Sequence, residues 1–230
     1  MNLEQAESLL AQTYLFHDLD QPAIATLAAE AHERSYKRHA SIFHEGDPGD
    51  AFFIIVEGAV KVYVTSVQGE EMVLTTMRSP ETLGEVSLFD EGPRSASAEA
   101  LEPARLLSLA RSTVLGLAGR DPRIFESLLC CAGELLRRLT TQAADLVFLD
   151  LEGRVAKLLA DSAEARGHQD GDRLALDLGF TQGELASMVG GSRQSVNQIL
   201  RALEGRGFID VDGATVVIED LAGLRRRAAM

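Results

Sequence analysis

The chain has 230 residues, more than the roughly 100 to 150 of a typical single domain, so two domains with separate cores are expected. Its composition, 46% hydrophobic and 25% charged, is that of a globular protein, and no stretch approaches the roughly 18 apolar residues of a membrane helix. Acidic residues replace the Lys or Arg of a secretory signal at the amino terminus. We therefore expect a cytoplasmic protein that does not contact membranes. The only cysteines, Cys130 and Cys131, are neighbours, which excludes a disulfide framework.

The formal net charge of −13 is unevenly distributed. Residues 150–230 carry 10 basic and 13 acidic side chains, a balance of −3, which leaves −10 for residues 1–149. The acidity therefore lies mainly in the amino-terminal part. It does not exclude nucleic-acid binding by the carboxy-terminal part, although phosphates attract Lys and Arg.

Residues 1–40 are predicted to be helical, with Asp20 capping a helix that contains Ile24 and Leu27. From Ser41 the pattern changes to short β-rich runs separated by glycine-containing turns. Many short strands at this spacing indicate a β-sandwich or jelly roll. The predicted strands cover residues 41–44, 51–56, 59–65, 70–77, 95–100 and 104–109.

A long helix is predicted after Asp121-Pro122, because proline fits the first helical turn. Its three-four spacing is typical of a coiled-coil seam, but a helix buried against its own domain has the same spacing, and the two alternatives remain open. A new helix capped by Asp150, with Val155 facing inward, marks the domain boundary. The seam would contain Phe125, Leu128, Ala132, Leu135, Leu139, Gln142 and Leu146.

The segment 84–96 brings a carboxylate, a guanidinium and a hydroxyl into one short strand-loop-strand unit. A cyclic nucleotide requires these groups. Arg94, Ser95 and the backbone of Ala96 can hold its phosphodiester, and Glu85 can accept a ribose hydroxyl. The alternative is that Glu85 and Arg94 form a structural ion pair that holds the loop.

Residues 181–203 have the pattern of a helix-turn-helix. Thr181 and Glu184 form a capping box, Gly190-Gly191 suits a tight turn, and Ser192 can cap the second helix. One face of that helix is apolar, and the opposite face carries long or amide side chains that can pair with base edges. These side chains are Arg193, Gln194, Asn197, Gln198 and Arg201.

Two short helices around a glycine turn also occur in proteins that never touch DNA. The residues that follow favour DNA binding, since residues 208–211 and 215–218 flank Asp212-Gly213, a strong hairpin signal, which indicates a winged helix-turn-helix. Arg225, Arg226 and Arg227 can add phosphate contacts, although such a run is more often a solvated tail.

Four segments, in order, resemble the cyclic AMP receptor protein/fumarate-nitrate regulator family of bacterial transcription regulators. They are HEGDPGDAFFIIVEGAVKVY, LGEVSLFDEGPRSASA, FLDLEGRVAKLL and TQGELASMVGGSRQSVNQILRALE. The resemblance implies an α+β fold with a β-roll (jelly-roll) cyclic-nucleotide-binding domain at 1–121, a dimerisation helix at 122–149 and a winged helix-turn-helix domain at 150–230. It also implies a homodimer that binds a double-stranded DNA operator and has RNA polymerase as a partner. The implied effector is a cyclic nucleotide, with cAMP as the first candidate.

By position in that family, Glu85 holds the ribose, Arg94 and Ser95 hold the phosphate, and the backbones of Gly84 and Val86 line the pocket. The chain departs from the family at the position that contacts the adenine base of the nucleotide. Leu139 stands where cAMP binders usually carry a Thr, and Thr140 follows in the neighbouring contact position. It departs again in the recognition helix, where Gln194 and Gln198 replace the usual Glu and Arg or Lys. Because a Gln side chain pairs well with adenine, we expect the operator sequence to differ from the family consensus.

Three other functions are weighed against this hypothesis. A ligand-independent or redox-responsive relative could use Cys130 and Cys131, but adjacent cysteines cannot both face one cluster. A metal-dependent jelly-roll enzyme could use His39, His44 and Glu45. The other histidines lie in predicted helices or loops, which leaves no three-ligand set with suitable spacing, so no metal and no enzymatic activity are expected. A subunit that binds only protein would leave the winged helix without a use.

Overall fold

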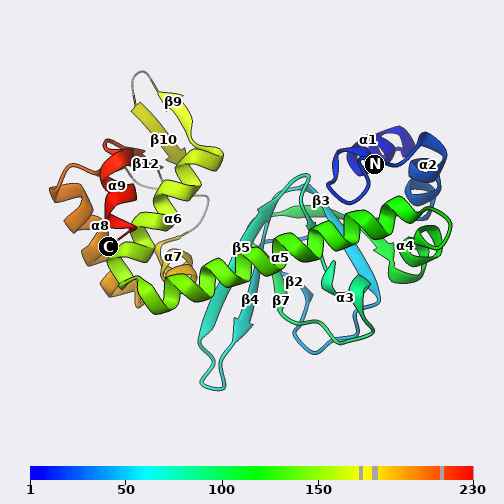
Figure 1. The fold of residues 1–230 in the computed structure, drawn as a ribbon, viewed down its shortest axis with the longest axis horizontal. Coiled ribbons are helices and arrows are strands. Elements are labelled where there is room, and N and C mark those ends of the chain that lie inside the picture. The colour runs from blue at the N-terminus through cyan, green and yellow to red at the C-terminus, as the bar shows by residue number, and fades with distance from the viewer. Residues whose placement is uncertain (171–172, 178–180, 213–214, 230) are drawn as a thin grey trace. The chain divides into compact units, whose positions relative to one another are not determined.

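The computed structural model describes residues 1–170, 173–177, 181–212 and 215–229. The chain divides into two compact units, Met1–Arg137 and Arg138–Met230. The first unit holds two four-stranded sheets with helices, and the second holds another four-stranded sheet with helices (Figure 1). The predicted α+β class is confirmed.

Two short helices, α1 (Leu3–Gln12) and α2 (Gln21–Glu30), begin the first unit. The Asp20 side chain caps α2 by accepting from the Ala23 N–H at 3.0 Å, as predicted. The prediction of helix through residue 40 is wrong, because β1 (His32–Tyr36) is a strand. Its sequence, HERSY, has no apolar stripe for a helix to bury, and all five residues pair with β8.

Eight strands form the two sheets of this unit, in the orders β1-β8-β3-β6 and β2-β7-β4-β5, with antiparallel neighbours. The six predicted strands are present within one or two residues. Besides β1, the short strand β6 (Thr82–Leu83) was not predicted. The others are β2 (Ser41–Phe43), β3 (Ala51–Glu57), β4 (Ala59–Thr65), β5 (Glu71–Arg78), β7 (Ser97–Ala100) and β8 (Ala104–Ala110).

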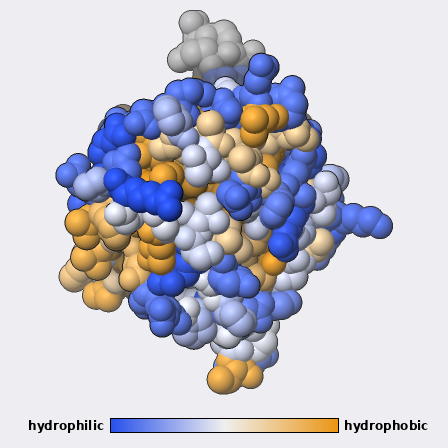
Figure 2. All heavy atoms as spheres, turned by 90° about the vertical axis from the view of Figure 1, so that its right-hand side faces the viewer, coloured by the Kyte–Doolittle hydropathy of each residue, from blue (hydrophilic) through white to orange (hydrophobic). Residues whose placement is uncertain are grey.

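Buried apolar side chains from both sheets, among them Ile55, Val60 and Leu106, form one core cluster. A second cluster lies where the helices cover a sheet, and there the Phe16 and Phe52 rings meet edge to face at 5.8 Å. The helices α3 (Val86–Phe89) and α4 (Arg111–Ala118) follow β6 and β8. Figure 2 shows the side of the molecule that lies at the right in Figure 1. This side carries hydrophilic residues with apolar patches among them.

The helix α5 (Pro122–Phe148) begins at the predicted proline and spans the division between the units. The alternative of a helix buried against its own unit holds for some of its apolar residues, and the coiled-coil alternative stays a prediction for the others. Leu128 is buried in the core of its own unit, whereas Leu129 and Leu136 are 73% and 66% exposed. Of the predicted seam residues, Phe125, Leu139 and Leu146 are exposed, whereas Leu128 is buried and Leu135 is partly buried; Leu129 and Leu136 join the exposed row without having been predicted. None of the helices in the described part of the chain is long and apolar enough to cross a membrane.

The second unit contains the predicted helix-turn-helix and the two predicted strands after it. The strands β11 (Ile209–Asp212) and β12 (Thr215–Ile218) pair antiparallel, and Gly213 of the predicted turn lies outside the described residues. The sheet order is β11-β12-β10-β9, and β9 and β10 were not predicted. The remaining elements are α6 (Leu151–Arg166), β9 (His168–Asp170), β10 (Arg173–Asp177), α7 (Gln182–Val189), α8 (Arg193–Gly205) and α9 (Leu221–Arg227).

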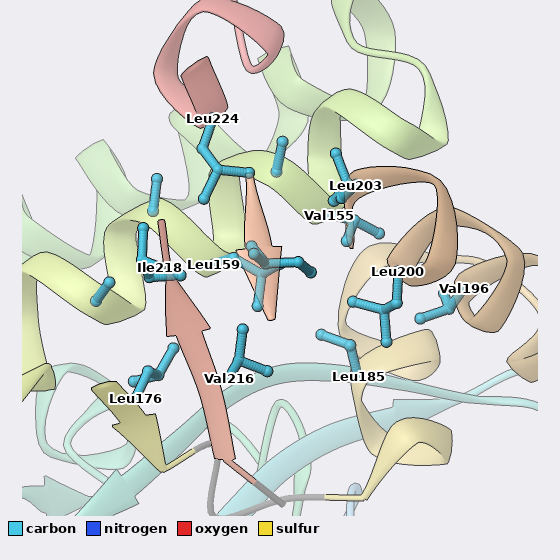
Figure 3. Close-up of a cluster of buried hydrophobic side chains, with 14 of the residues drawn as sticks. Val155, Leu159, Leu176, Leu185, Val196, Leu200, Leu203, Val216, Ile218 and Leu224 are labelled. Carbon is cyan, nitrogen blue, oxygen red and sulfur yellow. The ribbon is translucent and has the colours of Figure 1, made fainter. Parts of the chain in front are cut away.

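One hydrophobic core holds this unit together. Side chains from α6, α7, α8, β12 and α9 converge in it, including Leu159, Leu185, Leu200, Val216 and Leu224 (Figure 3). Asp150 caps α6 by accepting from the Gly153 N–H at 2.7 Å, as predicted. The recognition-helix candidate α8 is thereby anchored along its full apolar face.

The three terminal arginines belong to α9 and are not a solvated tail. Arg227 donates to Glu152 at 2.8 Å and to Asp150, and Arg225 contacts Asp161 and Glu164. Hydrogen bonds from Arg227 hold the pKa values of Asp150 and Glu152 below their ordinary values. These guanidiniums fasten α9 to α6.

We expect Arg227→Gln to lower the free energy of unfolding at pH 7 by about 1 to 2 kcal/mol, a figure reduced by solvent screening at the exposed Asp150. Since the folded pKa values of both carboxyls are depressed, this stabilisation is complete above about pH 5 and declines as the pH falls below about 4. Urea unfolding followed by circular dichroism across pH 3 to 7 measures it. Arg226→Gln is the matched control, because Arg226 is 71% exposed and makes one 3.4 Å contact with Asp220. Equal effects of both substitutions would contradict the prediction.

Candidate functional site

The cassette predicted at residues 84–96 begins at a tight turn after β6. Gly84 has φ +87°, in the left-handed region that favours glycine. A Cβ there would lie 2.6 Å from Nη1 of Arg94 and 3.2 Å from the Ala51 carbonyl oxygen. Glu85 follows as the N-cap residue of α3, and Val86 opens that helix, both partly buried. Only glycine allows the turn and the arginine to come this close.

Arg94 is the central charge of the cassette and is only 5% exposed. Its Nη1 donates to the Ser87 Oγ at 2.9 Å and to the Gly84 carbonyl at 3.4 Å, and its Nη2 donates to the Ala51 carbonyl. Its Nε is buried and makes no hydrogen bond within the described part of the chain. The site therefore holds a cation with one unused donor, which suits an anionic ligand.

The carboxylates around Arg94 and its burial act on its charge in opposite directions. Burial lowers the pKa of Arg94, while Asp50, Asp47 and Glu85 raise it. Glu85 is thus close enough for its charge to act on Arg94, as both the ribose-binding role and the structural ion pair require. An arginine keeps its charge in either case.

Backbone pairing fixes the loop that carries Arg94. The Arg94 N–H donates to the Asp47 carbonyl at 2.8 Å, and the Gly46 N–H donates to the Arg94 carbonyl at 2.9 Å. The Glu45 N–H donates to the Ser97 Oγ at 2.9 Å. Residues 45–47 and 94–97 are thereby held side by side. Of the other predicted ligand residues, Ser95 is exposed and Ala96 is buried.

The structure brings Gly84, Glu85, Val86 and Arg94 together, and it adds Ser87, which sequence reasoning missed. The sequence signal for Ser87 is a hydroxyl residue three positions after the turn glycine. Its Oγ also donates to the Gly84 carbonyl at 2.6 Å. Leu139 and Thr140 are exposed and belong to the other compact unit. Their place in the pocket remains a prediction.

The second predicted site is the turn between α7 and α8. Thr181 and Glu184 form the predicted capping box, Gly190 ends α7 with φ +66°, and Ser192 caps α8 by accepting from the Ser195 N–H at 3.1 Å. These hydroxyls of Thr181 and Ser192 therefore serve as helix caps. Val196, Leu200 and Leu203 are buried, which directs the opposite face of α8 to solvent.

That opposite face lines an open hollow of about 800 Å³. Arg193, Gln194, Asn197 and Gln198, which are the predicted DNA contacts of α8, line it together with Arg201 from the same face. Gln182, at the start of α7, was missed, and only its position beside Thr181 could have indicated it. Amide and guanidinium groups that converge on one surface can read base edges and hold phosphates.

Neither rival site is supported by the geometry. The described residues contain no group of three or more His, Cys, Asp or Glu side chains that could hold a metal. His39, with φ +63°, places its Nδ1 3.0 Å from Glu99. Cys130 is exposed and Cys131 partly buried, and neither forms a disulfide.

A β-roll sensor, a long helix and a winged helix-turn-helix with a polar reading face define a DNA-binding regulator. Two family models match the chain: a cyclic nucleotide-binding domain over residues 33–121 and a Crp-like helix-turn-helix domain over residues 153–227. The chain belongs to the cyclic AMP receptor protein/fumarate-nitrate regulator family of transcription regulators, which are not enzymes.

Three proteins illustrate the relationship. The chain is 37% identical to a CRP-like cAMP-activated global transcriptional regulator of Mycobacterium tuberculosis, over 96% of this chain and 99% of that one. It is 32% identical to the cyclic AMP receptor protein of Thermus thermophilus, over 93% and 96%. The solved structure of CLP, a c-di-GMP-responsive global regulator of Xanthomonas campestris, is 26% identical with a TM-score of 0.75, over 86% and 99%.

We expect Gly84→Ala to destabilise the protein more than Gly69→Ala. Both glycines have φ near +85°, so both substitutions carry a backbone strain of about 1 kcal/mol. A Cβ at Gly69 meets nothing within 4 Å, whereas one at Gly84 meets Arg94 and Ala51, which adds about 1 to 3 kcal/mol. Urea unfolding measures the difference, and equal losses would show that Arg94 moves aside freely.

Proposed function

We propose that the protein is a homodimeric, sequence-specific transcription regulator whose DNA affinity is controlled by a cyclic nucleotide, with cAMP the first candidate. The observation that carries the proposal is the buried Arg94 with its unused Nε donor. A phosphodiester supplies the negative charge and acceptor oxygens that this group needs. The two family models, one for each function, support the same assignment.

In the proposed complex, Arg94, the Ser95 hydroxyl and the Ala96 N–H bind the cyclic phosphate, and Glu85 accepts a ribose hydroxyl. Gly84 and Val86 contribute backbone to the pocket. Leu139 offers the base no hydrogen bond, so Thr140 is the polar contact that remains. Since two of the three similar proteins are named for cAMP and the third for its response to c-di-GMP, the effector has to be identified by experiment.

The proposed dimer forms through α5. Phe125, Leu129 and Leu136 are 49%, 73% and 66% exposed, and large apolar side chains in a row favour a partner helix. The proposed extents are 1–121 for the sensor, 122–149 for the dimerisation helix and 150–230 for the DNA-binding domain. The dimer would act in the cytoplasm, with RNA polymerase as its partner.

The proposed mechanism is a shift between two populations. The nucleotide binds more tightly to the dimer geometry that sets two recognition helices about 34 Å apart, one turn of DNA. Ligand and operator then strengthen each other's binding by the same factor. No metal takes part in this mechanism.

We expect Arg94→Ala and Glu85→Ala to lower nucleotide affinity at least tenfold, because each removes a charged hydrogen-bonding partner. Thermal-shift titration with cAMP, cGMP and c-di-GMP identifies the effector on the wild type, and fluorescence anisotropy with operator DNA then measures ligand-dependent binding. Glu91→Ala is the control, because Glu91 is an almost fully exposed carboxylate in the same loop. If neither variant changed the ligand response, the cassette would be structural.

The second specificity to be assigned is the base sequence of the operator. Arg193 is proposed to contact guanine, while Gln194, Asn197 and Gln198 favour adenine, since an amide pairs with N6 and N7 of that base. Arg193 and Arg201 form no ion pair within the described part of the chain, unlike Arg225 and Arg227. Their charges are therefore available to DNA.

Selection from random duplexes is expected to recover a palindrome enriched in adenine at the positions facing Gln194 and Gln198. Gln194→Glu should shift the preferred base to cytosine, because a carboxylate accepts from cytosine N4, at about 1 to 3 kcal/mol of discrimination. Recovery of one unchanged site by both proteins would contradict the assignment of Gln194.

A further inference from the structure

The Arg94 guanidinium lies over the Phe43 ring and, at a greater distance, over the Phe53 ring. Phe43 ends β2 and Phe53 lies in β3, and their rings stack with centroids 5.9 Å apart and an interplanar angle of 29°. The Arg94 Cζ lies 4.3 Å from the Phe43 centroid and 5.8 Å from the Phe53 centroid. A guanidinium at this distance from an aromatic face is attracted to it by a cation–π interaction.

Contact with a ring face restricts where the guanidinium can send its hydrogen bonds. All its N–H groups lie in one plane. A ring that packs against the guanidinium restrains the orientation of this plane and therefore the directions in which the N–H groups can donate. Nη1 and Nη2 already donate to Ser87, Gly84 and Ala51. The buried Nε makes no hydrogen bond within the described residues, and Nη2, which has two N–H groups and donates to Ala51, keeps a second N–H for a ligand.

We infer that Phe43 is a positioning residue for phosphate recognition: its ring holds the plane of Arg94 so that Nε and a neighbouring Nη donate together to the anionic group of the ligand. This inference rests on the proposed cyclic-nucleotide function and adds a specificity determinant to it. Paired donors in a fixed plane match two oxygens of a phosphate, which a mobile cation does not.

Phe43 also packs against the core cluster between the sheets, so its substitution has to separate packing from the aromatic contact. Phe43→Met keeps an apolar side chain of similar volume and removes the ring face. Phe43→Tyr keeps the ring. Packing alone predicts that the methionine variant behaves like the wild type, whereas the positioning role predicts that only the tyrosine variant does.

The experiment is isothermal titration calorimetry with cAMP on full-length wild type, Phe43→Met and Phe43→Tyr, with melting temperatures measured in parallel. We expect Phe43→Met to lower cAMP affinity about three- to tenfold and Phe43→Tyr to stay within twofold of the wild type. Phe16→Leu serves as the control, because Phe16 is fully buried in the other core cluster of the same unit. Its melting temperature should fall while its affinity for cAMP is kept.

Two results would overturn the inference. One is a methionine variant that binds cAMP as tightly as the wild type, and the other is a Phe16→Leu variant that loses affinity as much as Phe43→Met, which would indicate general loosening of the unit. Phe43→Leu replaces the methionine variant if the latter does not fold. A wild type that binds no cAMP would instead contradict the proposed effector, and the role of Phe43 would fall with it.

Discussion

A guanidinium buried inside the β-roll is the constraint on which the sensor geometry depends. A buried charge is costly unless it is hydrogen-bonded, so the chain must bring acceptors to Arg94 from several directions. Ala51 at the start of β3 provides one, and the turn at Gly84 with Ser87 provides the others. The positive φ of Gly84 and the pairing of residues 45–47 with 94–97 are local conformations that keep those acceptors in place.

Charge is used differently in the second unit, where similar arginines have separate tasks. Arg225 and Arg227 form ion pairs with acidic residues of α6 and hold α9 in the fold. Arg193 and Arg201 instead line the open hollow together with amide side chains. The sequence placed Arg193 and Arg201 on the polar face of α8, but it did not predict the ion pairs of the three-arginine run, which suggested phosphate contacts or a solvated tail. Whether a partner carboxylate lies nearby is decided by tertiary structure.

The sequence predicted most elements wherever local signals were strong. Alternating apolar residues between glycine turns located six strands, and side-chain caps located the starts of α2, α6, α7 and α8. β1 was missed because His32–Tyr36 is polar and its partner β8 lies about seventy residues later. Ser87 and Gln182 were missed for a related reason, since their roles come from segments that fold against them.

The helix α5 shows how little separates a core position from a surface one. Leu128 and Leu129 are neighbours, yet a rotation of about 100° per residue puts one in the core of its unit and leaves the other 73% exposed. Heptad spacing therefore included the exposed Phe125, Leu139 and Leu146 correctly, but it also included the buried Leu128 and omitted Leu129 and Leu136. Because α5 is one continuous helix that belongs to both units, a partner helix on that exposed row would restrain sensor and DNA-reading domain together. In the proposed mechanism, α5 is therefore the element through which occupancy of the Arg94 site would bias the spacing of two recognition helices.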